Sequence, residues 1–176
     1  MPRDVRSLES PSPRGARQPR RHLMVRSAGP EAVRSILVVV DGSDASNYAL
    51  SLACETAMRV HASLFGLHVI EVPRALPVDA ELTADLERGE EIMSAAEKAA
   101  SKYNLKLEGN IVQARHAGTA VVDEAAALRV DAVVIGLAYH RSYGRYEVGQ
   151  MALSVLENAA AQVWIIRYPP RPDQLA

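Results

Sequence analysis

The feature that most constrains this fold is an unbroken apolar run, ILVVV, at residues 36–40. A strand with one face in water alternates apolar and polar side chains, so this run indicates a strand that is covered on both faces. Strands of that kind belong to parallel sheets, whose crossover helices pack on both sides. The segment DGSD at residues 41–44 ends the run and supplies the turn and cap of a helix that we expect to reach about Val60.

The same alternation of short apolar runs and helical stretches continues along the chain and predicts βαβ units. We expect strands over residues 36–40, 64–70, 111–114, 132–135 and 163–166, and helices over 44–60, 80–103, 119–128 and 148–160. Gly89 interrupts the second helix, which is therefore expected to kink or to begin late. Right-handed crossovers then give an α/β fold, an open, doubly wound, parallel five-stranded sheet.

The first 34 residues differ from the rest in composition. They hold eight Arg against Asp4, Glu9 and Glu31, a net charge of +5, together with five of the ten Pro. Such a segment buries too little apolar surface to offset the entropy of ordering it. We expect residues 1–34 to be a disordered basic tail, residues 35–170 to be one folded domain and residues 171–176 to be a C-terminal tail. The first tail also resembles an organelle transit peptide, and Met24 is an alternative start.

Charge, cysteine content and hydropathy exclude several classes of function. The whole chain has a net charge of −1, which leaves −6 after residue 34 and disfavours binding to nucleic acid. A single cysteine, Cys54, excludes a disulfide framework and a thiolate zinc site, and it favours a reducing, cytoplasmic setting. No apolar run reaches the roughly 18 residues of a membrane span, so we expect no membrane insertion.

No arrangement typical of catalysis is visible, and we expect no catalytic residue and no metal site. GxSxG, HExxH and paired carboxylates at catalytic spacing are absent. His68 is interpreted as a histidine whose polar atoms are satisfied within the fold, and Cys54 as a small buried apolar residue.

Ligands of a doubly wound sheet bind at the carboxyl ends of the strands, where the strand order reverses. The loops after the first and fourth strands are therefore the expected binding region. Asp41 ends the first strand, where its carboxylate and the amides of the next helix would meet a ligand. Turn and cap chemistry alone also explains residues 41–44, although it explains Asp41 least, because that residue precedes the turn.

Two glycines border the long loop after the fourth strand. Gly136 would permit a sharp exit from the strand, and Gly149 would let helix amides approach a phosphate, although both also suit ordinary loop positions. Residues 139–146 gather three Tyr, two Arg and one His, which could clamp a small anion. A P-loop is excluded because Gln150 and Met151 stand where Lys and Ser or Thr are required.

Several blocks together resemble the universal stress protein family over nearly all of residues 35–168: ILVVVDGS at 36–43, LHV at 67–69, Gly118, DAVVIG at 131–136 and VWII at 163–166. The resemblance implies the strand order 3-2-1-4-5 and a homodimer formed through residues 163–166. It also implies binding of ATP or AMP, with Mg²⁺ accompanying ATP. Val39 and Val69 would then contact adenine, and Asp41 would face the nucleoside.

The nucleotide signature of that family is G-x2-G-x9-G followed by Ser or Thr. Here the four positions are Gly136, Tyr139, Gly149 and Gln150. The outer glycines match. Tyr139 brings a ring where the family brings bare backbone, and Gln150 brings an amide in place of a small hydroxyl.

Two functions remain open. In the first, the chain is a small regulatory module that binds an adenine nucleotide, with Tyr139, Arg141 and Arg145 replacing the usual phosphate loop. In the second, phosphate binding has been lost and the dimer is an interaction module for an unknown protein partner such as a membrane transporter. An enzyme of the related nucleotide α-hydrolase group is a weaker third alternative, because the SGGxDS motif is absent.

Overall fold

The computed structural model describes residues 33–138, 141–142, 145–146 and 148–169. Five parallel strands form one sheet: β1 (Ser35–Val39), β2 (Ser63–Glu71), β3 (Leu107–Ala114), β4 (Ala132–Leu137) and β7 (Gln162–Arg167). Four helices connect them: α1 (Asp44–Val60), α2 (Thr83–Ser101), α3 (Ala117–Leu128) and α4 (Gln150–Asn158). Two further short strands, β5 (Arg141–Ser142) and β6 (Arg145–Tyr146), form a separate antiparallel pair. Both predicted tails lie outside the described residues, except for residues 33 and 34 of the N-terminal tail.

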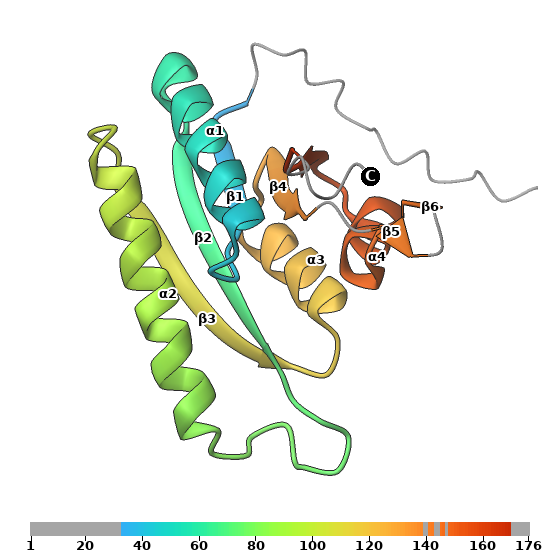
Figure 1. Cartoon of the computed structure of the whole chain (residues 1–176). Coiled ribbons are helices and arrows are strands. Elements are labelled where there is room, and N and C mark those ends of the chain that lie inside the picture. Colours follow the sequence, from blue (N-terminus) through green and yellow to red (C-terminus); the bar gives the residue numbers. More distant parts are fainter. Residues whose placement is uncertain (1–32, 139–140, 143–144, 147, 170–176) are drawn as a thin grey trace, which may run out of the picture.

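The strand order in the sheet is β3-β2-β1-β4-β7 (Figure 1). Counted within the sheet, β7 is the fifth strand, so the predicted order 3-2-1-4-5 is confirmed. After β1 the chain moves outward through β2 and β3 and then returns to β4 on the other side of β1. The strand order therefore reverses between β1 and β4, with β3 and β7 at the two edges.

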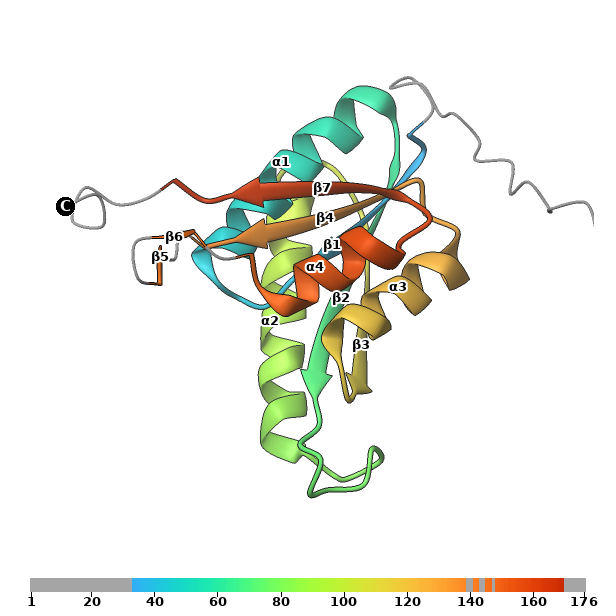
Figure 2. The ribbon, with the colours of Figure 1, turned by 90° about the vertical axis from the view of Figure 1, so that its right-hand side faces the viewer.

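The strands are sandwiched between two pairs of helices. Helices α1 and α2 pack on one face of the sheet, and α3 and α4 pack on the other (Figures 1 and 2). Alternate residues of the central strand enter the two cores: Ile36 and Val38 face α1 and α2, while Leu37 faces α3 and α4. All three side chains are fully buried, which confirms the expectation of a strand covered on both faces.

Element bounds differ from the expected ones where polar residues hide the pattern. Strand β3 begins at Leu107, four residues earlier than expected, because the polar residues 108–110 lie exposed on this edge strand. Helix α2 runs from Thr83 to Ser101, three residues later at its start than expected, and it continues through the buried Gly89, so Gly89 does not interrupt it. The β5–β6 pair was not expected, since strands of two residues leave no periodicity to detect. Within the described residues, no helix is both long and apolar enough to cross a bilayer.

One residue, Asp131, connects the amino ends of three strands through its side chain and its backbone. Asp131 Oδ2 accepts hydrogen bonds from the Arg34 amide at 2.8 Å, the Ser35 amide at 3.1 Å and the Ser35 hydroxyl at 3.0 Å. The Asp131 carbonyl accepts from the Gln162 amide at 2.9 Å. Since these groups begin β1, β4 and β7, Asp131 fixes the strand starts opposite the expected binding edge.

Replacing Asp131 with Ala should lower the free energy of unfolding by about 2 kcal/mol, because three donors lose a charged acceptor. Chemical denaturation measures the change. The matched control is Asp123→Ala, at an exposed position of α3, which should change stability by less than about 0.5 kcal/mol. Equal stabilities of the two variants would contradict this role of Asp131.

Candidate functional site

The turn after β1 is built by local hydrogen bonds. Gly42 has a φ of +79°, a left-handed conformation that favours glycine. Ser43 is the N-cap of α1, and its hydroxyl accepts from the Ser46 amide at 3.1 Å. The Asp41 carboxylate accepts from the Ser43 amide at 2.8 Å. The turn-and-cap interpretation of residues 41–44 is therefore confirmed, with Asp41 taking part in the turn.

That last contact corrects one expectation. Asp41 precedes the turn, yet its side chain closes the turn by accepting from the amide two residues ahead, as Asp side chains often do. This hydrogen bond within the turn is one reason for an Asp at position 41. Its contact with a ligand remains a prediction, and the side chain is exposed at the end of β1.

Opposing effects act on the Asp41 carboxyl. Burial by the surrounding turn raises its pKa, but hydrogen bonds from Ser43 and Ser46 outweigh that effect and leave the pKa below the ordinary 3.8. Asp41 is therefore a carboxylate at neutral pH, suited to accept hydrogen bonds from hydroxyl groups and unsuited to act as a general acid.

Ser46 is a residue of the turn that the sequence analysis did not single out. It is only 2% exposed; its hydroxyl accepts from the Asp41 amide at 3.3 Å and donates to the Ser43 carbonyl at 3.2 Å. The signal available in the sequence is the three-residue spacing of Ser43 and Ser46 at a helix start, which resembles a capping box without its acidic member.

Gly136 has a different role from the expected one. It lies inside β4, opposite Ile166, so the strand does not leave the sheet there. A Cβ at Gly136 would lie 2.3 Å from the Ala45 carbonyl oxygen of α1. The missing side chain therefore allows the first turn of α1 to pack directly on β4, beside the point where the strand order reverses.

Val39 and Val69 lie toward the same face of the sheet. Val39 ends β1 and is 8% exposed, and Val69 of β2 packs against the same core with α3 and α4. Gly149 and Gln150 begin α4, which covers this face (Figure 2). Both are exposed, and a Cβ at Gly149 would meet nothing within 4 Å. These four residues thus border the carboxyl ends of β1, β2 and β4.

The other predicted residues of the loop are only partly placed. Tyr139 lies outside the described residues. The backbone of Arg141 lies in β5, where it pairs with Tyr146, and the backbone of Arg145 lies in β6. Their proposed contact with phosphate stays a prediction.

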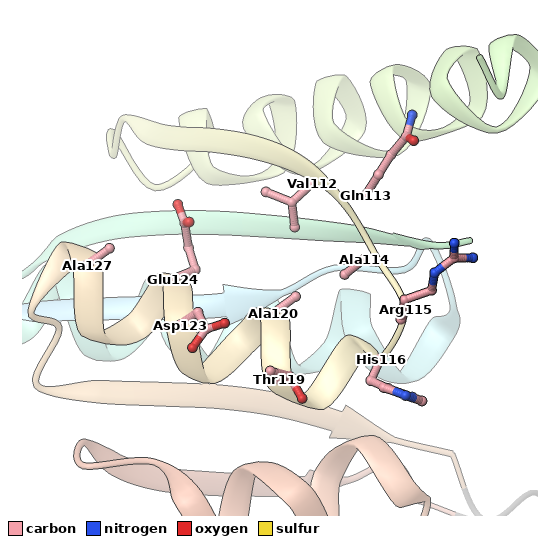
Figure 3. A pocket seen from close by; sticks show the side chains of 10 residues that line it. All are labelled: Val112, Gln113, Ala114, Arg115, His116, Thr119, Ala120, Asp123, Glu124 and Ala127. Atoms are coloured by element: carbon pink, nitrogen blue, oxygen red, sulfur yellow. The ribbon is translucent and has the colours of Figure 1, made fainter. Parts of the chain in front are cut away.

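A groove of about 410 Å³ lies elsewhere, between β3 and α3 at the edge of the sheet (Figure 3). It contains none of the predicted site residues. Arg115, which lines it, donates to the backbone carbonyls of Val72, Pro73 and Leu76 and so holds the β2–α2 loop. Glu124 of α3 accepts from the side-chain amide of Asn110 in β3 at 2.9 Å. The groove is therefore a separate feature of the sheet edge.

Two chemical alternatives can be assessed directly. Burial raises the pKa of the Cys54 thiol to about 11, so it stays protonated at neutral pH and is a poor nucleophile. Across the described ranges, no group of three or more His, Cys, Asp or Glu side chains is arranged to hold a metal ion.

Gly136→Ala should lower the free energy of unfolding by about 3 kcal/mol or more, because its methyl group would collide with main-chain atoms that cannot move aside. Gly149→Ala is the matched control. With a φ of −61° and open space around it, this position should tolerate Ala within about 1 kcal/mol. Thermal or chemical denaturation of both variants tests the comparison, and a mild effect at Gly136 would disprove the close packing of α1 on β4.

The carboxyl of Asp41 should titrate below 3.8 in the folded chain, as measured by NMR against pH. Because the folded pKa is lowered, its contribution to stability is complete above 3.8 and is lost as pH falls through the folded pKa. Asp41→Asn should remove this part of the acid dependence of unfolding. A titration midpoint at or above 3.8 would contradict the hydrogen bonds described for the turn.

Comparison with known proteins agrees with this geometry. A curated universal stress protein of Methanocaldococcus jannaschii is 26% identical over 149 residues, which cover 81% of this chain and 87% of that protein. A universal stress protein of Archaeoglobus fulgidus, solved in complex with dAMP, has a TM-score of 0.61 and 22% identity over 75% of this chain and 96% of its own. An Arabidopsis thaliana universal stress protein family protein, solved with AMP bound, has a TM-score of 0.56 and 18% identity over 81% of this chain and 95% of its own.

At these identities the two solved structures establish the likeness of fold. The family itself follows from the sequence comparison, since the model of the universal stress protein family matches residues 32–167, from just before β1 to the end of β7. This chain belongs to the universal stress protein family.

Proposed function

We propose that this chain is a small regulatory module that binds an adenine nucleotide, ATP or AMP, at the carboxyl ends of β1, β2 and β4. The observation that carries the proposal is the Asp41 turn, an ordered and ionised acceptor beside the reversal of strand order. The dAMP and AMP bound to relatives of the same fold support the choice of an adenine nucleotide.

The base and sugar would occupy the face that Val39 and Val69 border. Both side chains are apolar and belong to or pack against the α3–α4 core, so they offer adenine a surface without unpaired polar atoms. Asp41 lies two residues beyond Val39, the last residue of β1, and its carboxylate would accept hydrogen bonds from the ribose hydroxyls.

Charge favours the start of α4 for the phosphates. Acidic side chains already occupy three of the four described helix starts: Asp44 is in the first turn of α1, Asp85 is in that of α2, and Glu71 accepts from the Ala117 amide of α3 at 2.7 Å. Helix α4 has no acidic residue in its first turn and no side-chain cap. Among the described helix starts, the positive dipole end of α4 is therefore the most favourable place for an anion.

Three further features complete the proposed site. Gly149 leaves open space for phosphate at the start of α4, and Gln150 offers an amide in the place of the family's hydroxyl. Tyr139 and Arg141, on the loop that leads to α4, would supply a phenol and a cation to the phosphates. Mg²⁺ would enter with ATP, held mainly by the phosphate oxygens, because a small hard cation is often bound through substrate phosphates.

A homodimer through β7 is part of the proposal. This strand pairs only with β4 within the described sheet, and its apolar residues 163–166 are half-buried rather than buried. An exposed apolar edge is a ready template for pairing with a second strand, and the second copy of the chain is the occupant that we propose.

The same edge supports a second function, in which the chain acts as an interaction module without a nucleotide. The apolar strand would then serve partner recognition alone, and no ligand would contact the Asp41 turn. The two functions differ in one measurable property, the affinity for AMP or ATP.

The test is to purify the full chain, denature it and identify any released nucleotide, and then to titrate the folded chain with ATP and AMP by calorimetry. Affinity in the micromolar range is expected. Asp41→Ala should weaken it at least tenfold, since the ribose hydroxyls lose a charged acceptor. Asp123→Ala, an exposed acidic position on α3, is the matched control and should leave the affinity unchanged.

Absence of both released nucleotide and heat would contradict the proposal and favour the interaction module. Unchanged affinity in Asp41→Ala would show that the nucleotide binds elsewhere. Incubation with ATP provides a third readout, because steady release of phosphate would mean that the module is an enzyme after all.

A further inference from the structure

The central strands separate at one peptide unit beside the proposed site. The last residue pair in the β1–β2 ladder is Val39 with Leu67. The next amide, that of Val40, still donates to the Leu67 carbonyl at 2.8 Å. The Val40 carbonyl, however, is bound by a side chain, since His68 Nδ1 lies 2.7 Å from it. A carbonyl oxygen can only accept, so Nδ1 carries the proton and donates it.

The peptide unit between Val40 and Asp41 is therefore held from both sides. His68 of β2 binds its carbonyl oxygen, and the Ser46 hydroxyl of α1 accepts from its amide, which belongs to Asp41, at 3.3 Å. Rotation of this peptide unit would break both hydrogen bonds and swing the Asp41 side chain away. The orientation of Asp41 thus depends on hydrogen bonds of its backbone peptide unit as well as on those of its carboxylate.

The His68 ring lies on the face of the sheet away from the proposed base pocket. Its neighbours Leu67 and Val69 face the core formed with α3 and α4, so the His68 side chain, alternating with them, points toward α2. A contact with α2 confirms this direction, because a Cβ at Gly89 would lie 2.9 Å from His68 Cδ2. His68 consequently acts behind the site and does not touch a nucleotide bound at Val39 and Val69.

Helix α2 supports both the ring and the turn. Gly89 is buried inside the helix, where its missing side chain leaves room for the His68 ring. One turn further, Ile92 approaches the turn itself, with Cγ1 3.0 Å from the place of a Cβ on Gly42. Gly89 and Ile92 are three residues apart, so they lie on one side of α2.

We propose that His68 is a positioning residue of the nucleotide site. Through its bond to the Val40 carbonyl, and with Gly89 behind its ring, it sets the spacing between the Asp41 turn of β1 and Val69 of β2. This inference rests on the proposed function and adds to it the residue that aligns the two strand ends. A purely structural role, in which His68 only satisfies a buried carbonyl, would affect stability without affecting AMP affinity selectively.

Two substitutions at His68 separate these roles in the full chain. His68→Asn keeps an N–H donor close to the place of Nδ1, whereas His68→Leu keeps a similar bulk and removes the donor. His68→Leu should weaken AMP binding tenfold or more in calorimetry, and it should speed hydrogen exchange at the Asp41 amide. His68→Asn should retain AMP affinity within about threefold. Asp131→Ala, which disturbs the opposite end of the sheet, controls for a general loss of stability and should keep full affinity.

A third variant serves in case His68→Leu does not fold. Gly89→Ala places a methyl group against the ring while favouring the helix, so it should weaken AMP binding without unfolding the chain. Hydrogen exchange at the Asp41 amide should also be faster in this variant, because the displaced His68 ring no longer holds the Val40 carbonyl.

The outcomes are distinct. If the unchanged chain does not bind AMP, the proposed function fails and this inference fails with it. If the unchanged chain binds AMP and His68→Leu binds it equally well, only the positioning role is overturned. Where His68→Leu does not fold, equal binding by Gly89→Ala has the same meaning. Equal losses in His68→Leu and His68→Asn would also overturn it, since the donor would then be irrelevant. Loss in His68→Leu with rescue in His68→Asn, or loss in a folded Gly89→Ala variant, supports it.

Discussion

The burial of β1 on both faces is the constraint on which the rest of the structure depends. Ile36, Leu37 and Val38 are completely removed from water, and no single layer of helices can achieve that. The chain must place α1 and α2 on one side and α3 and α4 on the other, and it must do so with neighbouring strands on both edges of β1. That requirement produces the reversal of strand order beside β1 and therefore the position of the proposed site.

Missing side chains shape the site as much as present ones. Gly136 lets the start of α1 pack on β4, and Gly89 leaves room for the His68 ring behind the end of β1. A glycine inside a helix costs about 1 kcal/mol relative to alanine, so Gly89 indicates a close contact worth that cost. Both glycines act on the Asp41 turn from outside it, one through α1 and the other through His68.

The charges at the helix starts favour one position for the phosphates of a nucleotide in the proposed site. The start of α1 carries Asp41 and Asp44, and the amide at the start of α3 is bound by Glu71, so both repel an anion or are already occupied. Within the described residues, the first turn of α4 carries no acidic residue, and its N-cap Gly149 has no side chain to bind the amides. A nucleotide whose sugar lies at Asp41 therefore has one favourable course for its phosphates, across the strand ends toward Gly149. The two departures from the family signature, Tyr139 and Gln150, are the residues most relevant to the proposed affinity for a nucleotide.

Local chemistry in the sequence was sufficient to predict a doubly wound parallel sheet, the two-sided burial of β1 and a helix cap within residues 41–44, because apolar periodicity and capping preferences act between residues that are close along the chain. The order of the strands in the sheet followed from the resemblance to the family. The place of Asp41 at a strand end identified it as a candidate site residue, whereas Val39 and Val69 became candidates through the resemblance to the family. Local chemistry misjudged Gly136, and it did not show what His68 binds or why Gly89 is tolerated. Those roles depend on contacts between segments far apart in the sequence, α1 on β4 and α2 on β2, and only the packed tertiary structure decides such contacts.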